Sequence, residues 1–138
     1  MTNRWKRIFK LFGLFLVLLG SGQAWAHGMS KPGPNGGFVQ MPGAFHTELV
    51  LSGSSGFEVF LLDEEIKHPT TRRSSVVVSV KQGQGEIKIP CDKATDHFTC
   101  HLPEGFRLKL GDSILIRSNR AGSAQGISIY KMPFKRAD

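Results

Sequence analysis

The sequence predicts an all-β fold, an immunoglobulin-like antiparallel β-sandwich of seven to eight strands. Apolar and polar residues alternate along most of residues 45–138, which is typical of strands with one face against a core. Short turns rich in Gly, Pro, Ser or Asp separate these runs, and no stretch shows a convincing helical period. Short strands divided by turns in a chain of this length indicate a two-sheet sandwich.

The expected strands follow one another along the chain. The first covers residues 45–52, with Phe45, Leu49 and Leu51 on one face and His46 and Glu48 on the other. A Ser-Gly-Ser-Ser-Gly turn then leads to the second, over residues 57–63. The apolar positions of the remaining strands are Val76, Val78 and Val80; Ile87 and Ile89; Phe98, Cys100 and Leu102; Leu108 and Leu110; Ile114 and Ile116; and Ile127 and Ile129.

The first 26 residues have the composition of a secretory signal peptide. Four basic residues precede a short apolar run, Leu11–Leu19, and Ala24 and Ala26 supply the small side chains that signal peptidase requires. We therefore expect export to the periplasm, cleavage after Ala26, and no stable membrane insertion afterwards. An uncleaved anchor is the alternative. The expected organisation is a signal peptide over 1–26, an amino-terminal metal-site segment over 27–44, and the sandwich domain over 45–138.

The charge of the chain does not favour nucleic-acid binding. The formal net charge is +7, but four of the positive charges belong to the leader. The remaining basic residues are scattered along the chain, without the stripe of cations and stacking aromatics that nucleic acids require. We expect them to be solvated surface residues.

The two cysteines are expected to form a disulfide. Cys91 and Cys100 point the same way from neighbouring strands, with residues 92–99 as the hairpin connection. Export to an oxidising compartment favours their pairing. A thiolate metal site is the alternative, but the spacing is not that of a CxxC motif.

A metal chelate is the main functional prediction. Cleavage after Ala26 would leave His27 at the amino terminus, where its α-amine and imidazole Nδ1 can hold one ion. One further imidazole would complete a three-nitrogen set that suits Cu(II). We expect His46 to supply it, because the turn-rich segment 32–37 can fold the terminus back toward this residue.

Further ligands are candidates near the same place. Glu48 shares a strand face with His46, and the thioethers of Met29 and Met41 would suit Cu(I). Zinc or silver in place of copper stays open. Both methionines could instead be gap-filling hydrophobes, which is the favoured interpretation for Met41 because Pro42 follows it. The three remaining histidines are expected to be surface residues: His68, His97 and His101.

Three segments resemble small exported β-sandwich proteins found beside heavy-metal efflux systems. They are the Pro-Asn-Gly-Gly turn at 34–37, the Phe-His-Thr-Glu-Leu-Val strand at 45–50, and the Phe-Glu-Val-Phe-Leu-Leu-Asp strand at 57–63. The resemblance implies a periplasmic, copper-linked role. A mature amino-terminal histidine on a small sandwich also resembles the CopC-type periplasmic copper carriers, although the strand motifs here differ from theirs.

Three functions therefore remain in view. The favoured one is a periplasmic copper-binding carrier or resistance protein, whose partners would be the metal ion and a metal-efflux or envelope protein. The second is a metal-free interaction or accessory module of an envelope complex. The third is a histidine-brace copper oxidase or monooxygenase, with Tyr130 as a conceivable axial group. Because no long insertion offers a substrate platform, we expect the protein not to be an enzyme.

Overall fold

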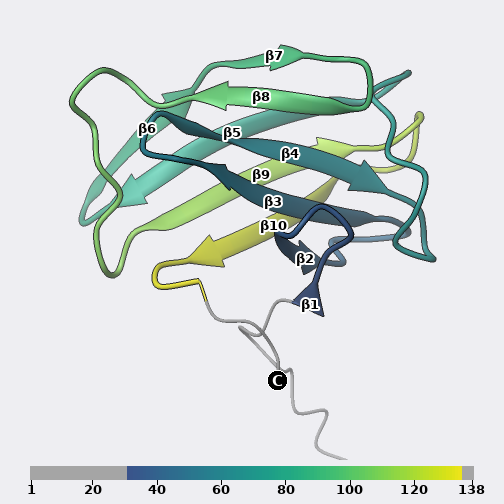
Figure 1. Ribbon diagram of the computed structural model, residues 1–138, viewed down its shortest axis with the longest axis horizontal. Helices are drawn as coiled ribbons and strands as arrows, with labels where there is room; N and C mark the ends of the chain where they lie inside the picture. Colours follow the sequence, from purple (N-terminus) through teal and green to yellow (C-terminus); the bar gives the residue numbers. More distant parts are fainter. Residues whose placement is uncertain (1–30, 135–138) are drawn as a thin grey trace, which may run out of the picture.

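The computed structural model describes residues 31–134, which form an all-β domain of two antiparallel sheets (Figure 1). Within this range no helix is present, and so none could cross a membrane. The strands are β1 (Lys31–Pro32), β2 (Phe38–Gln40), β3 (His46–Ser52), β4 (Gly56–Leu62), β5 (Ser75–Gln82), β6 (Gly85–Ile89), β7 (Cys91–Lys93), β8 (His97–His101), β9 (Ser113–Asn119) and β10 (Gly126–Lys131).

The strand order is that of an immunoglobulin-like sandwich. The first sheet has the order β1-β2-β3-β4-β8-β7 and the second has the order β10-β9-β5-β6. From β3 onward these orders correspond to strands A-B-E-D and G-F-C-C′ of an immunoglobulin domain. The predicted fold class is confirmed, and the short strands β1 and β2 extend the first sheet beyond it.

One expected strand does not form. Leu108 and Leu110 lie in the connection between β8 and β9, and the side chain of Leu110 is 80% exposed. This connection carries the chain from the first sheet to the second, where Asp112 accepts a hydrogen bond from the backbone N–H of Lys109. The alternation there was misleading, because a segment that crosses between sheets has no neighbouring strand to pair with.

The core lies between the sheets and follows the predicted alternation. From the first sheet, β4 contributes Phe57, Val59 and Leu61. From the second sheet, β5 and β9 contribute Val78, Val80, Ile114 and Ile116. All seven side chains are essentially inaccessible to solvent.

A polar contact closes one side of the sandwich. The side-chain amide of Gln40 on β2 donates from Nε2 to the carbonyl oxygen of Ile129 at 2.6 Å. Its Oε1 accepts from the backbone N–H of the same residue at 2.9 Å. The amide thus pairs with edge strand β10 as the backbone of a further strand would.

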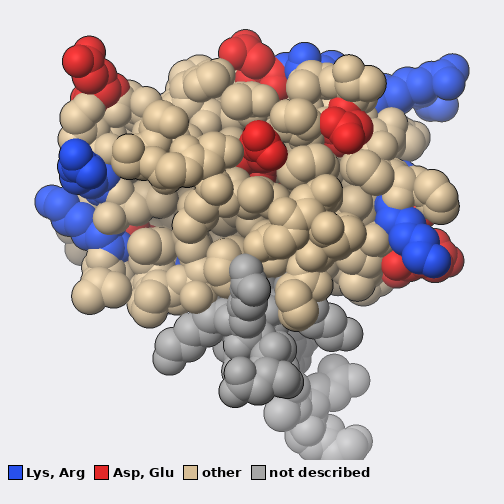
Figure 2. Space-filling model, viewed as in Figure 1, with Lys and Arg blue, Asp and Glu red and all other residues tan. Residues whose placement is uncertain are grey.

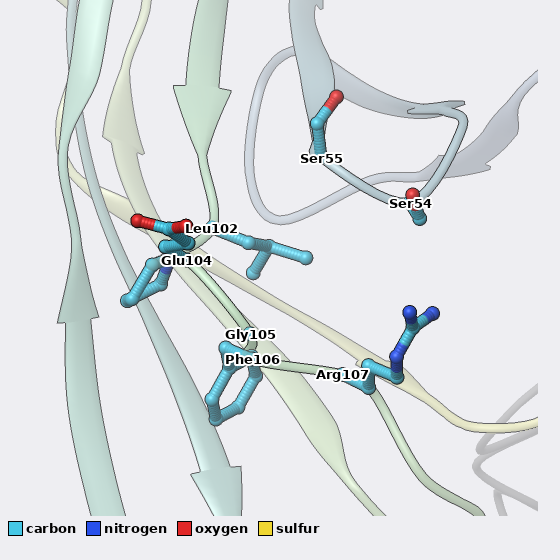
Figure 3. Close-up of a pocket in the computed structure, with 8 residues that line it drawn as sticks. Ser54, Ser55, Leu102, Glu104, Gly105, Phe106 and Arg107 are labelled. Carbon is cyan, nitrogen blue, oxygen red and sulfur yellow. The ribbon is translucent and has the colours of Figure 1, made fainter.

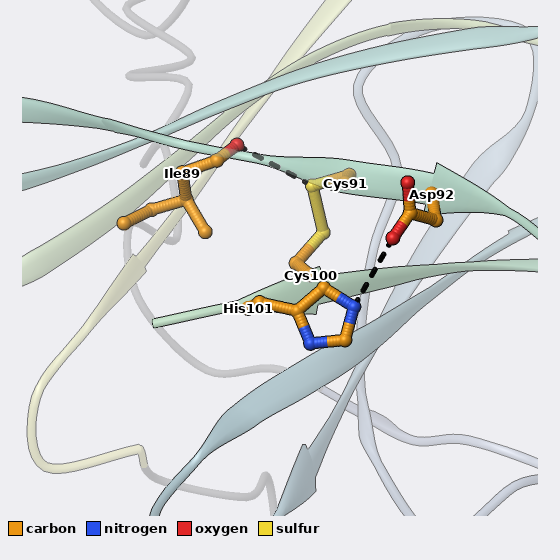
Figure 4. Close-up of a disulfide and its surroundings, with 5 residues drawn as sticks. All are labelled: Ile89, Cys91, Asp92, Cys100 and His101. Carbon is orange, nitrogen blue, oxygen red and sulfur yellow. Dashed lines mark hydrogen bonds and ion pairs between the residues drawn. A yellow bond between two sulfur atoms is a disulfide. The ribbon is translucent and has the colours of Figure 1, made fainter. Parts of the chain in front are cut away.

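The chain changes sheets at Pro90, between β6 and β7. Proline has no N–H to donate, so it interrupts the ladder where the strand leaves the second sheet and joins the first. Directly after this crossing, Cys91 lies opposite Cys100 in the register of β7 and β8. The two form the predicted disulfide, with a Cα–Cα distance of 4.0 Å (Figure 4). His101, on the outer face, contacts the Asp92 carboxylate at 3.3 Å.

Candidate metal site around His46

His46 begins β3 on the outer face of the first sheet and is half-buried. Its Nδ1 lies 2.9 Å from the backbone carbonyl oxygen of Asp63. Because a carbonyl oxygen can only accept, Nδ1 must carry the proton, and Nε2 of the neutral ring keeps its lone pair. Within residues 31–134, Nε2 has no hydrogen-bond partner. Metal-binding histidines are usually oriented by such a bond from their other ring nitrogen.

The carbonyl group that orients His46 belongs to a turn, beginning at Asp63, that several hydrogen bonds stabilise. The Asp63 carboxylate accepts from the backbone N–H of Lys67 at 2.8 Å, and it contacts His68 Nδ1 at 2.6 Å. The hydrogen bond with His68 lowers the pKa of the Asp63 carboxyl group below its usual value, although desolvation opposes the shift. Ile66 and His68 both have positive φ, at 62° and 48°, so this turn is tightly coiled.

The second sheet also supports this turn. The guanidinium group of Arg120 donates to the carbonyl oxygen of Leu61 at 3.1 Å and to that of His68 at 2.7 Å. These bonds connect the β9–β10 turn with both sides of the loop that begins at Asp63. The carbonyl group beside His46 is therefore fixed by contacts from both sheets.

Met41 directly follows β2 and is not packed in the core. The last paired residues of β2 and β3 are Gln40 and Thr47. Continuing this register by one residue sets Met41 opposite His46. Its side chain is 59% exposed, so it does not fill a gap in the interior. Met41 is therefore accessible to solvent near the end of β3 that carries His46.

β1 runs parallel to β3 and is separated from it by β2. Lys31 pairs with Val39, which in turn pairs with Glu48, so Lys31 is at the end of β1 that lies nearer to His46. Two strand spacings and two residues along β3 separate Lys31 from His46, or about 12 Å between Cα atoms. His27 and Met29 lie outside the described residues. The four residues from His27 to Lys31 can span about 13 Å, so the expected terminus is long enough to reach His46.

Glu48 is committed to the turn between β1 and β2. Its Oε1 accepts from the backbone N–H groups of Asn35 and Gly37, both at 2.9 Å, and its Oε2 accepts from Asn35 Nδ2 at 2.9 Å. The side chain is fully buried beneath this turn. A Cβ atom on Gly33 would overlap the Glu48 carboxylate, and one on Gly37 would overlap the Leu49 carbonyl. The Asn-Gly-Gly motif and the glutamate therefore form one structural unit.

Sequence reasoning missed the role of Asn35 in this unit. The signal was present, because an acidic residue at the centre of a strand follows shortly after a glycine-rich turn with an asparagine. A buried carboxylate needs several hydrogen-bond donors, and a turn whose glycines allow close approach can supply them.

Tyr130 lies on the opposite face of the first sheet from His46. It is 1% exposed and faces the core, where its hydroxyl donates to the carbonyl oxygen of Thr47 at 2.9 Å. Burial raises the pKa of Tyr130 above its usual value. Thr47 faces inward and His46 faces outward from the same strand, so the sheet separates the two rings. The prediction of Tyr130 as an axial group beside this histidine is wrong.

The other histidines do not join His46 in a cluster. His97 contacts the Asp96 carboxylate at 2.8 Å and stacks on Phe60 with ring centroids 5.0 Å apart. His68 is bound to Asp63, as described above. Within residues 31–134, no three His, Cys, Asp or Glu side chains are arranged to hold a metal ion.

A shallow hollow of about 230 Å³ lies at the opposite end of the sandwich from His46. It is formed by the β3–β4 turn and the start of the β8–β9 connection (Figure 3). The Glu104 carboxylate and the Arg107 guanidinium group point away from each other there. The hollow therefore lacks the converging polar groups of a binding site.

Comparison of the chain with protein-family models, curated proteins and solved structures finds no match.

Proposed function

We propose that this protein binds one copper ion as cargo and acts as an exported copper carrier or resistance factor. In this proposal the amine and imidazole of His27, set free by cleavage after Ala26, supply two nitrogen ligands, and Nε2 of His46 supplies the third. The observation that carries the proposal is the hydrogen bond from His46 Nδ1 to the Asp63 carbonyl. It leaves Nε2 able to coordinate without a change of tautomer.

Two further observations support this assignment. The strand register sets Lys31 about 12 Å from His46, a distance that the four residues from His27 to Lys31 could span in an extended conformation. Met41 is exposed and directly follows the last residue of β2 that pairs with β3, and soft thioether ligands favour Cu(I). A site with both nitrogen and thioether donors would retain copper in either oxidation state, which suits a carrier better than an enzyme.

Glu48 is not a ligand in this proposal. Its two carboxylate oxygens already accept three hydrogen bonds, and the side chain is fully buried beneath the β1–β2 turn, where an ion bound at the surface does not reach it. Its contribution is to hold the β1–β2 turn, and with it the position of Lys31 at the start of β1.

The test is a Cu(II) titration of the exported protein with a verified His27 terminus, followed by electron paramagnetic resonance. We expect one tightly bound Cu(II) with a nitrogen-rich signal. His46→Ala, or one extra residue before His27, should weaken binding by about a hundredfold or more, because even the loss of an orienting group costs 10–100-fold.

The matched control is His97→Ala, which removes an imidazole that pairs with Asp96 on the same sheet face. It should leave the affinity and the spectrum unchanged. Equal affinity in the parent, the His46 variant and the extended protein would contradict the proposal and favour the metal-free interaction module.

A further inference from the structure

The outer face of the second sheet has an apolar centre that no described element covers. We call this surface the second-sheet face; it consists of the outward residues of β5, β6, β9 and β10. Val77 is 49% exposed, and Ile127 and Ile129 are each 53% exposed. Ile129 pairs with Leu115 in the ladder, so the aliphatic side chains of β9 and β10 form a continuous group.

Basic side chains lie on the same face as this apolar group. Arg117 lies between Ile127 and Val77 in the register of three adjacent strands. Lysines stand at three other outward positions of the face: Lys81, Lys88 and Lys131. None of the four forms an ion pair or a side-chain hydrogen bond within residues 31–134. The face has one acidic residue, Glu86, which accepts a hydrogen bond from Ser79 at 2.6 Å.

Four strands of the opposite sheet, β3, β4, β7 and β8, have acidic instead of basic residues on their outer face. The outward positions of β3, β4, β7 and β8 contain no Lys or Arg, but they include Glu58 and Asp92. Figure 2 shows acidic side chains in the middle of this first-sheet face and basic ones toward its margins. The basic residues are therefore distributed unevenly between the two faces of the sandwich, with more of them on the second-sheet face.

The composition of the second-sheet face selects among possible partners. A second copy docked face to face would bring the four cations against their own kind. Protein interfaces are enriched in aromatic residues and depleted in lysine, whereas this face has no aromatic side chain and three lysines. Aliphatic side chains ringed by Lys and Arg are typical of surfaces that bind anionic bilayers, where the long basic side chains reach the headgroups.

We propose that the second-sheet face is a docking surface for an anionic phospholipid bilayer. The cations contact the lipid phosphates, and the side chains of Val77, Ile127 and Ile129 enter the boundary between headgroups and acyl chains. The first-sheet face, with His46, then points away from the bilayer. This proposal does not depend on copper binding, because it concerns the opposite face of the sandwich from His46.

The test is cosedimentation of the protein with vesicles of phosphatidylcholine alone or of equal parts phosphatidylcholine and phosphatidylglycerol. We expect binding to the anionic vesicles only, and its loss at high salt, because each cation near an anionic surface contributes about fivefold to the partition coefficient. Lys81→Glu/Lys88→Glu should lower binding at least about tenfold. Ile127→Ser/Ile129→Ser should lower it by a similar factor.

Matched controls lie elsewhere on the surface. Lys67→Glu/Lys109→Glu makes the same change of charge in exposed loops, and Leu110→Ser removes an 80% exposed leucine from the β8–β9 connection. Both should bind as the parent does. All variants share one background, so any contribution of residues 1–30 cancels, and circular dichroism verifies their folding.

Absence of binding to the anionic vesicles would overturn the proposal. So would equal losses in the face and control variants, which would indicate net charge alone. Binding to soluble polyglutamate but not to vesicles would also overturn it, in favour of an acidic protein partner.

Discussion

Glu48 is fully buried and accepts three hydrogen bonds, so its replacement should cost much more stability than that of other strand glutamates. Glu48→Ala leaves the buried N–H of Gly37 without a partner, which costs about 1–3 kcal/mol. It also removes the two bonds from Asn35 and leaves a void. Together these losses should lower the free energy of unfolding by about 3–5 kcal/mol.

Glu48→Gln removes the negative charge but can keep three hydrogen bonds, so it measures the contribution of the charge to stability. The glutamine Oε1 can keep both backbone donors, and Asn35 can turn its side-chain amide to accept from the new NH2 group. Three neutral bonds then replace three charge-assisted ones, for a loss of about 1–2 kcal/mol. Asn35→Asp alone would set two carboxylates against each other across a gap now spanned by a 2.9 Å bond.

Combining Glu48→Gln with Asn35→Asp restores a donor opposite an acceptor. The double variant should therefore be more stable than the sum of the two single losses predicts, with a coupling energy of about 1–2 kcal/mol. Urea unfolding followed by circular dichroism measures all four proteins. The control is Glu58→Ala on β4, a half-buried glutamate on the same outer face, which should cost less than about 1 kcal/mol. Equal losses for Glu48→Ala and Glu58→Ala would refute the reasoning.

Three other predictions test the fold. Replacing both Cys91 and Cys100 with serine should lower the free energy of unfolding by about 2–3 kcal/mol, and a reducing agent should then shift the urea midpoint of the parent protein but not that of the variant. Gly37→Ala should lower the free energy of unfolding by about 2 kcal/mol or more, because its Cβ would overlap the backbone of β3. Gly43→Ala is the control and should be tolerated, since the nearest atom to its Cβ would be 3.9 Å away. A similar urea midpoint for both variants would contradict the close approach of Gly37 to β3. Burial raises the pKa of Tyr130, the only tyrosine, so the folded chain favours the neutral phenol. The unfolded chain ionises above about pH 10, and the free energy of unfolding should therefore fall as the pH rises above that value. Tyrosinate absorbance should therefore appear only together with unfolding, and its appearance in the folded protein would contradict the buried position.

The fold could be predicted because alternation reports directly which residues face a core. Phe57, Val59 and Leu61 face inward as expected. Alternation could not foresee that Phe60 and Leu62, on the outer face of the same strand, are also buried. Phe60 packs against the ring of His97 on the neighbouring strand β8, and a local pattern does not contain such a contact between strands.

The candidate site was only partly predictable for a similar reason. His46 was identifiable as a polar residue on a strand beside a turn-rich segment. The Asp63 carbonyl that orients it comes from the neighbouring strand end, and Arg120, which holds that turn, comes from the other sheet. Glu48 fits the pattern of a ligand and that of a structural anchor equally well. The donors that distinguish the two roles become visible only in three dimensions.

The amide of Gln40 has a consequence for how this sandwich could associate or misfold. The amide binds both backbone groups of Ile129. An incoming strand therefore cannot form hydrogen bonds with β10 at this residue. The other side, where β6 and β7 end the two sheets, has no such seal in the described domain. Strand exchange and fibril growth should therefore begin at that side, and Gln40→Ala should open a second route by exposing the edge of β10.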